Sequence, residues 1–224
     1  MPGHKIIRKG RVKGIFITGT DTGVGKTLIT GYLAKYFRGL EYNCFTQKWI
    51  KTGSSSKDGA PYSFRLPASP HLAAEFEHRK IGLKKIINSF KDLGSKSDFV
   101  LVEGIGGALV PFNKRQLVID IVKALNLPVL IVAQNKLGAI NHTLLTIESL
   151  KSRGIDILGI VFNNLKGEKK FILKDNPGII KAFAQVTIFG CLPWAKNKAK
   201  LYEKFIPIAG AIKKSLWTRG LKKT

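Results

Sequence analysis

The chain has 224 residues, of which 44% are hydrophobic, so it is long and apolar enough to bury the core of a single globular domain. Its formal net charge of +24 is typical of nucleic-acid-binding proteins, but the basic residues are scattered and lack interleaved aromatic residues that could stack on bases, so we expect no nucleic-acid partner. No apolar run approaches the ~20 residues that span a bilayer and no secretory leader is recognisable, which predicts a cytoplasmic protein without a membrane partner.

The predicted elements alternate between strands and helices. After a basic arm at residues 1–13 we expect one domain over residues 14–224, with strands at 15–17, 42–49, 99–102, 129–133, 155–162 and 186–189 and helices at 27–37, 83–93, 117–125, 141–152 and 206–217. Residues 53–70 are rich in Ser, Gly and Pro and are expected to form a loop. Nearly all the strands are continuously apolar, which indicates an α/β fold with a mostly parallel sheet covered by helices on both faces.

The glycine-rich segment GTDTGVGKT, residues 19–27, lies between the first strand and the first helix. Its glycines let the backbone turn so that unpaired amides at the helix start face an anion. Lys26 is placed to reach the β- and γ-phosphates of a nucleotide, and the Thr27 hydroxyl is placed to hold Mg²⁺. The segment therefore predicts a P-loop NTPase, in a variant form with threonine at the first glycine position, whose nucleotide-binding residues are Thr20, Asp21, Gly23, Val24, Gly25, Lys26, Thr27 and Leu28.

Polar or glycine residues follow the later strands at the sheet edge that parallel strands would share with this loop. They are Lys48 and Thr52, Glu103 with a second glycine-rich turn at 104–107, Lys136 with Gly138, and Asn163. A carboxylate at the end of a strand is the hard oxygen ligand that Mg²⁺ prefers. For Glu103 the alternative is a carboxylate that only stabilises the turn after it.

Four other residues are expected to be structural. Cys44 and Cys191 stand far apart beside apolar runs, which predicts buried free thiols with neither a disulfide nor a metal. His142 lies on an otherwise apolar helix, and Trp194 follows the last strand. For both side chains we expect packing and no part in a site.

Six segments resemble, in order over residues 14–194, the motifs of the dethiobiotin synthetase family: GTDTGVGKT, QKWIKTGS, LVEGIGGALVP, NKLGAINHTLLT, GIVFNN and LPW. The resemblance implies an ATP- and Mg²⁺-dependent ligase of biotin biosynthesis whose small-molecule substrates are 7,8-diaminononanoate and CO₂. In that reaction an amine takes up CO₂ as a carbamate, a carbamate oxygen attacks the γ-phosphate of ATP, and the second amine closes a cyclic urea. The family also implies a homodimer with the substrate near the subunit boundary.

The resemblance implies three catalytic residues, Lys48, Lys26 and Thr22. Lys48 would hold the carbamate anion beside the γ-phosphate and neutralise charge in the transition state, while Lys26 and Thr22 would act on the phosphates. Thr52 would form a hydrogen bond near the reacting nitrogen. These roles describe catalysis by positioning and electrostatics, with no covalent nucleophile.

The remaining family positions concern substrate and nucleotide binding. Gly106 and Gly107 would offer backbone amides to phosphate or substrate, and Gly138 and Asn141 would bind the substrate carboxylate at a helix start. For Asn141 a plain helix cap is an equal alternative. Asn163 would bind adenine, and the backbone near Pro193 would complete that pocket.

For the metal, the family implies Thr27, Glu103 and an aspartate from a segment that is shortened here. Asp58 is the acidic residue available in that segment, so it is expected either to replace the missing ligand or to be a solvated loop carboxylate.

Three rival functions remain. A partitioning-type ATPase that binds DNA or a membrane has a similar loop, but it carries an early lysine where this chain has Asp21. A cobyrinate-type amide ligase normally has an additional glutamine-hydrolysing domain, for which 224 residues leave little room. The third rival is a homologue that binds nucleotide with weak turnover because its loop is shortened.

Overall fold

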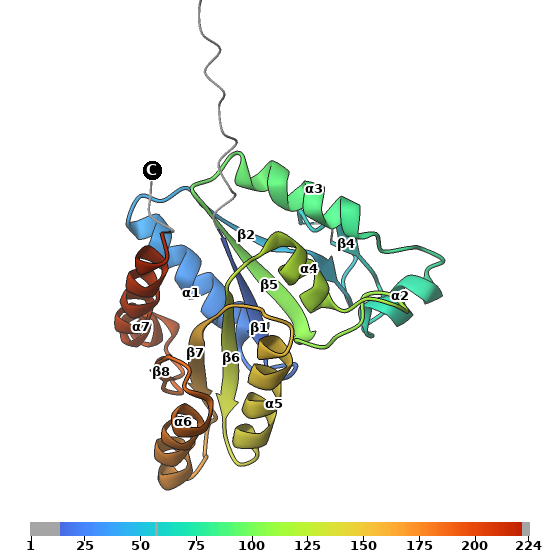
Figure 1. Ribbon diagram of the computed structural model, residues 1–224. Helices are drawn as coiled ribbons and strands as arrows, with labels where there is room; N and C mark the ends of the chain where they lie inside the picture. The colour runs from blue at the N-terminus through green and yellow to red at the C-terminus, as the bar shows by residue number, and fades with distance from the viewer. Residues whose placement is uncertain (1–13, 57, 221–224) are drawn as a thin grey trace, which may run out of the picture.

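The computed structural model describes residues 14–56 and 58–220, and the basic arm expected at residues 1–13 lies outside them. Within the described residues, six parallel strands form the main sheet in the order β2–β5–β1–β6–β7–β8 (Figure 1). Their bounds are β1 (Gly14–Gly19), β2 (Cys44–Lys48), β5 (Phe99–Gly107), β6 (Val129–Asn135), β7 (Ile157–Asn164) and β8 (Ile188–Leu192). The predicted α/β fold with a parallel sheet is confirmed.

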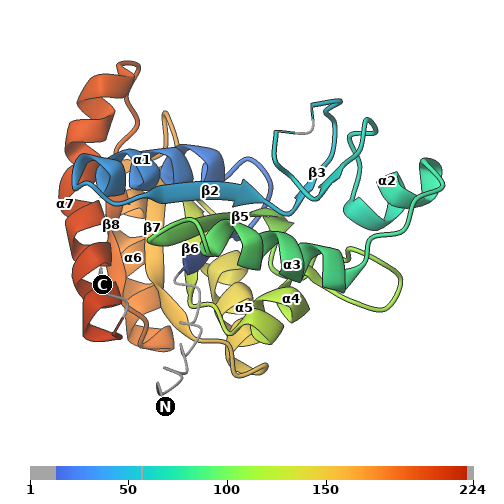
Figure 2. The ribbon, with the colours of Figure 1, turned by 90° about the horizontal axis from the view of Figure 1, so that it is seen from above.

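Helices cover both faces of this sheet (Figures 1 and 2). One face is covered by α1 (Lys26–Gly39) and α7 (Lys198–Thr218), and the other by α3 (Leu83–Gly94), α4 (Val118–Leu125), α5 (Ala139–Lys151) and α6 (Lys170–Ala184). Side chains of the central strand alternate between the two cores: Ile15 and Ile17 pack with α1 and α7, whereas Phe16 packs on the opposite side. No helix in the described part of the chain is both long and apolar enough to cross a membrane.

A small second unit continues from the end of β2 (Figure 2). It consists of β3 (Ile50–Lys51), which pairs in parallel with β4 (Tyr62–Ser63), followed by α2 (Pro70–Phe76). The strand predicted at 42–49 is shorter in the structure and ends at Lys48, and the loop predicted at 53–70 contains β4. Both predictions were therefore wrong in part. Backbone hydrogen bonds from Tyr62 N to Trp49 O (3.2 Å) and from Phe64 N to Lys51 O (2.9 Å) join the two short strands. Such pairing between distant segments leaves no periodic signal in the sequence.

Several helix predictions need correction. Neither α2 nor α6 was predicted from the sequence, and α7 begins at Lys198 where a start at residue 206 was expected. Pro177 lies inside α6 and Pro207 inside α7, so both segments resemble interrupted helices in sequence. The start of α7 is fixed by Asn197, whose side-chain oxygen accepts hydrogen bonds from Ala199 N (2.9 Å) and Lys200 N (3.1 Å).

The predicted glycine-rich turn at 104–107 is in fact part of β5, which pairs with β1 as far as Gly107. Glycine is needed within this strand because a Cβ atom at Gly104 would lie 2.7 Å from the Phe16 ring. The last strand also lies later than predicted, at Ile188–Leu192.

The four residues expected to be structural differ in burial. Both cysteines are free thiols, as predicted, but only Cys44 is fully buried and Cys191 is half-buried. Burial raises the pKa of Cys44 to about 12, so this thiol is unreactive near neutral pH. His142 and Trp194 are exposed, and Trp194 carries the Lys166 ammonium over its ring at 4.8 Å, so their predicted packing role was wrong.

Candidate active site

The loop between β1 and α1 has the backbone that phosphate binding requires. Gly23 (φ +75°) and Gly25 (φ +104°) adopt left-handed conformations that only glycine adopts without strain. Gly25 also lies against the end of β7, since a Cβ atom at this position would lie 2.4 Å from Asn163 Nδ2. Asn163 Nδ2 donates a hydrogen bond to Val24 O (3.1 Å). The α1 amides therefore begin at a fixed turn and point into the space beyond it.

Lys26, the first residue of α1, folds back over this loop. Its Nζ atom donates to Asp21 O (2.9 Å), and the residue is only 8% exposed. Burial lowers the pKa of the Lys26 ammonium, and the nearby carboxylates of Glu103 and Asp21 partly oppose that shift. A buried ammonium without its phosphate partner is therefore less basic than an ordinary lysine.

This shift predicts that nucleotide affinity depends on pH. Bound phosphates stabilise the charged form of Lys26, so affinity should fall as the pH rises above the lowered pKa of the free protein, by up to about tenfold per pH unit. The dissociation constant of a non-hydrolysable ATP analogue, measured without metal from about pH 7 to pH 10, checks this. The Lys26→Arg protein keeps its charge throughout that pH range, so its nucleotide affinity should not fall as the pH rises. An equal fall in affinity for both proteins would show that Lys26 is not the cause of the pH dependence.

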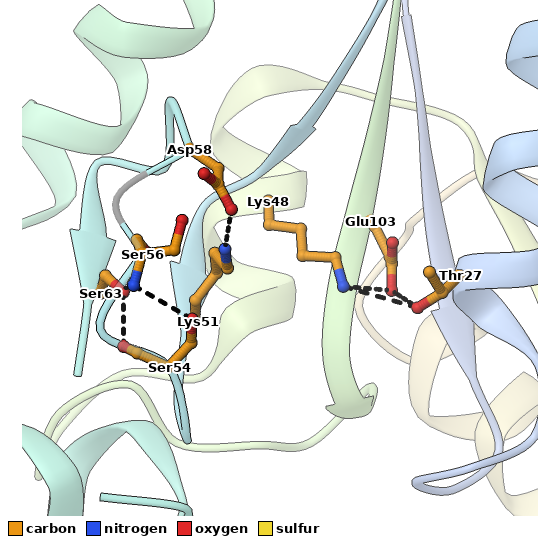
Figure 3. Close-up of polar contacts among 8 residues, drawn as sticks. All are labelled: Thr27, Lys48, Lys51, Ser54, Ser56, Asp58, Ser63 and Glu103. Carbon is orange, nitrogen blue, oxygen red and sulfur yellow. Dashed lines mark hydrogen bonds and ion pairs between the residues drawn. The ribbon is translucent and has the colours of Figure 1, made fainter. Parts of the chain in front are cut away.

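Lys48, Glu103 and Thr27 meet at the sheet edge (Figure 3). Lys48 ends β2 and lies opposite Glu103 of β5 in the strand register. Its Nζ atom is 3.0 Å from Glu103 Oε1 and 3.5 Å from Thr27 Oγ1, and the Thr27 hydroxyl donates to the same Glu103 oxygen at 2.5 Å. Glu103 is 7% exposed, so this buried carboxylate is neutralised by the ammonium group of Lys48.

The Thr27 and Glu103 oxygens fit a Mg²⁺ site. An ammonium group already lies against both, which shows that the position favours a cation, and one carboxylate with one hydroxyl matches the few protein ligands that Mg²⁺ takes beside phosphates and water. Within residues 14–56 and 58–220 there is no cluster of three or more His, Cys, Asp or Glu side chains that would hold a metal by protein ligands alone.

A cavity of about 340 Å³, here called the reaction cavity, lies between the phosphate loop, the end of β2 and β5. It brings together nine residues that the sequence predicted for catalysis, nucleotide, substrate or metal: Thr22, Gly23, Gly25, Lys26, Thr27, Lys48, Thr52, Glu103 and Gly106. A larger hollow of about 850 Å³ lies beside α2 and α3 and contains none of the predicted site residues, so its size does not make it the reaction site.

A neighbouring cavity of about 370 Å³, here called the side cavity, lies between α1 and β2. It shares Thr27, Lys48, Lys51 and Glu103 with the reaction cavity and also includes Asp58. Asp58 forms an ion pair with Lys51, with Oδ2 2.8 Å from Nζ. Asp58 is 70% exposed, which fits the predicted alternative of a solvated loop carboxylate.

Nine predicted residues line neither cavity: Thr20, Asp21, Val24 and Leu28 of the phosphate loop and the start of α1, and Gly107, Gly138, Asn141, Asn163 and Pro193. Asn163 lies at the end of β7, Pro193 directly follows the neighbouring strand β8, and Gly107 closes β5 beside β1. Gly138 and Asn141 lie at the start of α5. The helix cap is Gly138 (φ +85°), so the alternative that made Asn141 the cap is wrong, and Asn141 is an exposed residue of the first turn.

Sequence reasoning missed Lys51, Ile50 and Ile105, which line the reaction cavity. Lys51 was visible in the segment QKWIKTGS, but its position three residues after Lys48 did not reveal that β3 turns it toward the same cavity. The ion pair to Asp58 depends on a loop whose path is set by β4, and no local pattern signals it.

Comparisons with known proteins identify relatives of this chain. A family model described as an AAA domain matches residues 13–200. An ATP-dependent dethiobiotin synthetase from Thermodesulfovibrio yellowstonii is 36% identical over 228 residues, which cover 86% of this chain and 94% of that protein. One from Bacillus licheniformis is 35% identical over 81% of this chain and 86% of its own length. The chain belongs to the dethiobiotin synthetase family.

Solved structures show how widely this family's fold is shared. The MinC:MinD cell division complex of Aquifex aeolicus matches with a TM-score of 0.59 at 15% identity, over 95% of this chain and 97% of that chain. A plasmid partition protein from Borrelia burgdorferi bound to AMPPNP matches with a TM-score of 0.61 at 14% identity, over 94% of this chain and all of that chain. At this identity the likeness establishes the fold alone. The two dethiobiotin synthetases, by contrast, match at 36% and 35% identity.

Proposed function

We propose that this protein is an ATP- and Mg²⁺-dependent ligase that forms the cyclic urea of dethiobiotin from 7,8-diaminononanoate and CO₂. The observation that carries the proposal is the position of Lys48, whose ammonium group lies in one cavity with the phosphate loop, Glu103 and Thr52. The reaction is inferred from membership of the family. The residues of this cavity include the charged and hydrogen-bonding groups that the reaction needs. We infer that the protein acts in the cytoplasm, where its substrate ATP is available.

The proposed reaction has three steps. An amine of the substrate adds to CO₂ and loses a proton, giving a carbamate anion. A carbamate oxygen then attacks the γ-phosphorus of ATP, and the bond from that phosphorus to the β–γ bridging oxygen breaks, which releases ADP. The second amine attacks the carbamate carbon, the carbon–oxygen bond to phosphate breaks, and phosphate leaves with the loss of a further proton.

The residues act by holding charges in place. Lys26 and the α1 amides would bind the phosphates, with Thr22 beside them, and Lys48 would move from Glu103 to the oxygens between the carbamate and the phosphoryl group. Bound Mg²⁺, held by Thr27 and Glu103, would neutralise charge on the β- and γ-phosphates. Thr52 lines the same cavity and would accept or donate a hydrogen bond at the reacting nitrogen.

A direct assay tests the proposal. Purified protein with ATP, Mg²⁺, bicarbonate and diaminononanoate should release ADP only when the diamine is present, and mass spectrometry should detect the cyclic urea. Absence of diamine-stimulated ADP release would contradict it and would favour the homologue with weak turnover. DNA binding at low salt is expected to be undetectable; a steeply salt-dependent affinity would instead favour the partitioning-type rival.

We also infer a homodimer that uses the surface formed by the start of α5 and by α6. Leu137 (76% exposed) lies in the loop just before α5, Phe171 (68%) and Phe183 (73%) lie on α6, and an apolar hollow of about 720 Å³ includes the first two. Exposed apolar patches of this kind are typical of interaction surfaces. Gly138 and Asn141, expected to bind the substrate carboxylate, are on the same α5 start and away from the reaction cavity, so a second copy would bring them to its partner's substrate.

Paired substitutions test this surface. Sedimentation of the unmodified protein should give a mass twice the 24.7 kDa of one chain, and the protein with both Leu137→Asp and Phe171→Asp should have the mass of a monomer. Phe76→Asp is the matched control, because Phe76 is 69% exposed on α2 at the other end of the molecule. A dimer that survives the paired substitutions would place the interface elsewhere.

A further inference from the structure

Lys51 lies on the wall that the reaction cavity and the side cavity share. Its backbone is fixed because β3 pairs with β4, with Phe64 N donating to Lys51 O at 2.9 Å. Its side chain is 18% exposed, and its Nζ atom is 2.8 Å from Asp58 Oδ2 (Figure 3). The Lys51 side chain is therefore held both at its backbone and at its ammonium group, unlike that of a freely rotating surface lysine.

The loop that carries Asp58 is tied to the same small unit. Ser63 of β4 lies beside this loop (Figure 3), and its hydroxyl donates toward Ser54 O (3.0 Å) and Ser56 O (2.8 Å). The backbone N–H of Ser54 donates to Phe64 O (3.1 Å). Asp58 is 70% exposed, and an exposed ion pair alone contributes little to stability. Because both partners belong to one hydrogen-bonded unit, the pair is better explained by the position it gives to Lys51 than by the stability it adds.

The charges in the reaction cavity point to an anion beside Lys51. Three lysines, Lys26, Lys48 and Lys51, line the cavity together with one carboxylate, that of Glu103, which pairs with Lys48; Asp58 pairs with Lys51 from outside the lining, so one positive charge remains in excess. Lys26 lies on the phosphate loop, whereas Lys51 directly precedes Thr52, the residue expected near the reacting nitrogen. An ammonium group has three N–H donors, and the single bond to Asp58 uses one.

We propose that Lys51 binds the carbamate anion of the substrate together with Lys48, and that Asp58 positions Lys51 and is not a magnesium ligand. This inference rests on the proposed function and adds a second cation to its substrate site. Lys51 would neutralise the carbamate while Lys48 acts on the phosphoryl group. The hydrogen bond from Lys51 holds the pKa of the Asp58 carboxyl below its ordinary value, so the positioning anion persists throughout the neutral range.

Substitution of Lys51 tests whether its ammonium group binds the carbamate. Lys51→Met should lower kcat/KM for the diamine by roughly ten- to hundredfold and leave the affinity for an ATP analogue unchanged, because a charge-assisted hydrogen bond to the carbamate is lost. Lys51→Arg should recover most of the activity. Lys91→Met, on the exposed side of α3, is the matched control. A Lys51→Met protein indistinguishable from this control would overturn the inference while the proposed function stands.

Substitution of Asp58 tests the positioning role through metal affinity as well as activity. Asp58→Asn should lower kcat/KM for the diamine several-fold but bind Mn²⁺, in the complex with ADP, as tightly as the control Asp92→Asn. A loss of Mn²⁺ affinity of about tenfold or more would show that Asp58 is a metal ligand and would overturn its positioning role. If the unmodified protein formed no cyclic urea, the proposed function and the carbamate assignment would both fail, whereas the Mn²⁺ comparison would still decide the role of Asp58.

Discussion

Replacing Lys48 with methionine is expected to lower kcat by roughly a thousandfold and to leave nucleotide binding intact, because the lost ammonium group stabilises charge that develops only between the carbamate and the phosphoryl group. In the ligand-free protein this group lies 3.0 Å from Glu103 Oε1, at the position proposed for the metal. Steady-state formation of the cyclic urea gives kcat, and titration with an ATP analogue gives the affinity. A kcat within about tenfold of the unmodified protein would remove Lys48 from the mechanism.

The same substitution should have a second effect that a merely structural residue would not cause. Without nucleotide, Lys48 competes with a metal ion for the Glu103 carboxylate, so Lys48→Met should bind Mn²⁺ more tightly than the unmodified protein. Lys48→Arg keeps the competing charge and is the matched control. Equal Mn²⁺ affinities in all three proteins would contradict the assignment of Glu103 as the metal ligand.

Replacing Gly25 with alanine is expected to weaken nucleotide binding by at least about a hundredfold, since each lost charge-assisted phosphate contact accounts for about a tenfold change or more. The backbone at Gly25 is left-handed, with φ of +104°, and the new Cβ atom would lie 2.4 Å from Asn163 Nδ2. The loop must therefore shift, and the amides at the start of α1 move away from the phosphates. Titration with an ATP analogue measures the loss.

Two further variants separate the causes of that loss. A Cβ atom at Gly23 (φ +75°) meets nothing within 4 Å, so Gly23→Ala adds backbone strain without a collision and should weaken binding much less. Gly25→Ala combined with Asn163→Ala removes the collision and should recover part of the affinity. Equal affinities for Gly25→Ala and Gly23→Ala would show that contact with β7 does not set the loop geometry.

The parts of this site that could be predicted from sequence are those encoded by neighbouring residues. The order of strand, glycines, Lys26 and Thr27 specifies the phosphate loop locally, and the rule that parallel strands end at one edge placed Lys48 and Glu103 beside it. The register Lys48↔Glu103 confirms that placement. The apolar strands likewise predicted the sheet, because burial on both faces leaves a continuous hydrophobic run.

The parts that could not be predicted depend on pairing between distant residues. The unit of β3 and β4 turns Lys51 toward the cavity through two-residue strands that are too short to show a period. In α6 the sequence Pro177-Gly178 resembles a break, yet the helix continues because Ile180 and Ala184 are buried by the rest of the fold. In both regions tertiary packing outweighed local preference.

Isotope transfer tests the central claim, that a carbamate oxygen attacks the terminal phosphoryl group in the cavity between the phosphate loop and Lys48. When the reaction is started with C¹⁸O₂, before exchange with water, each released phosphate should carry one ¹⁸O atom and the urea carbonyl should retain the other. Mass spectrometry of both products in a single turnover gives the answer. Phosphate without label, formed together with labelled urea, would mean that the carbamate oxygen never bonded to phosphorus and would contradict the account.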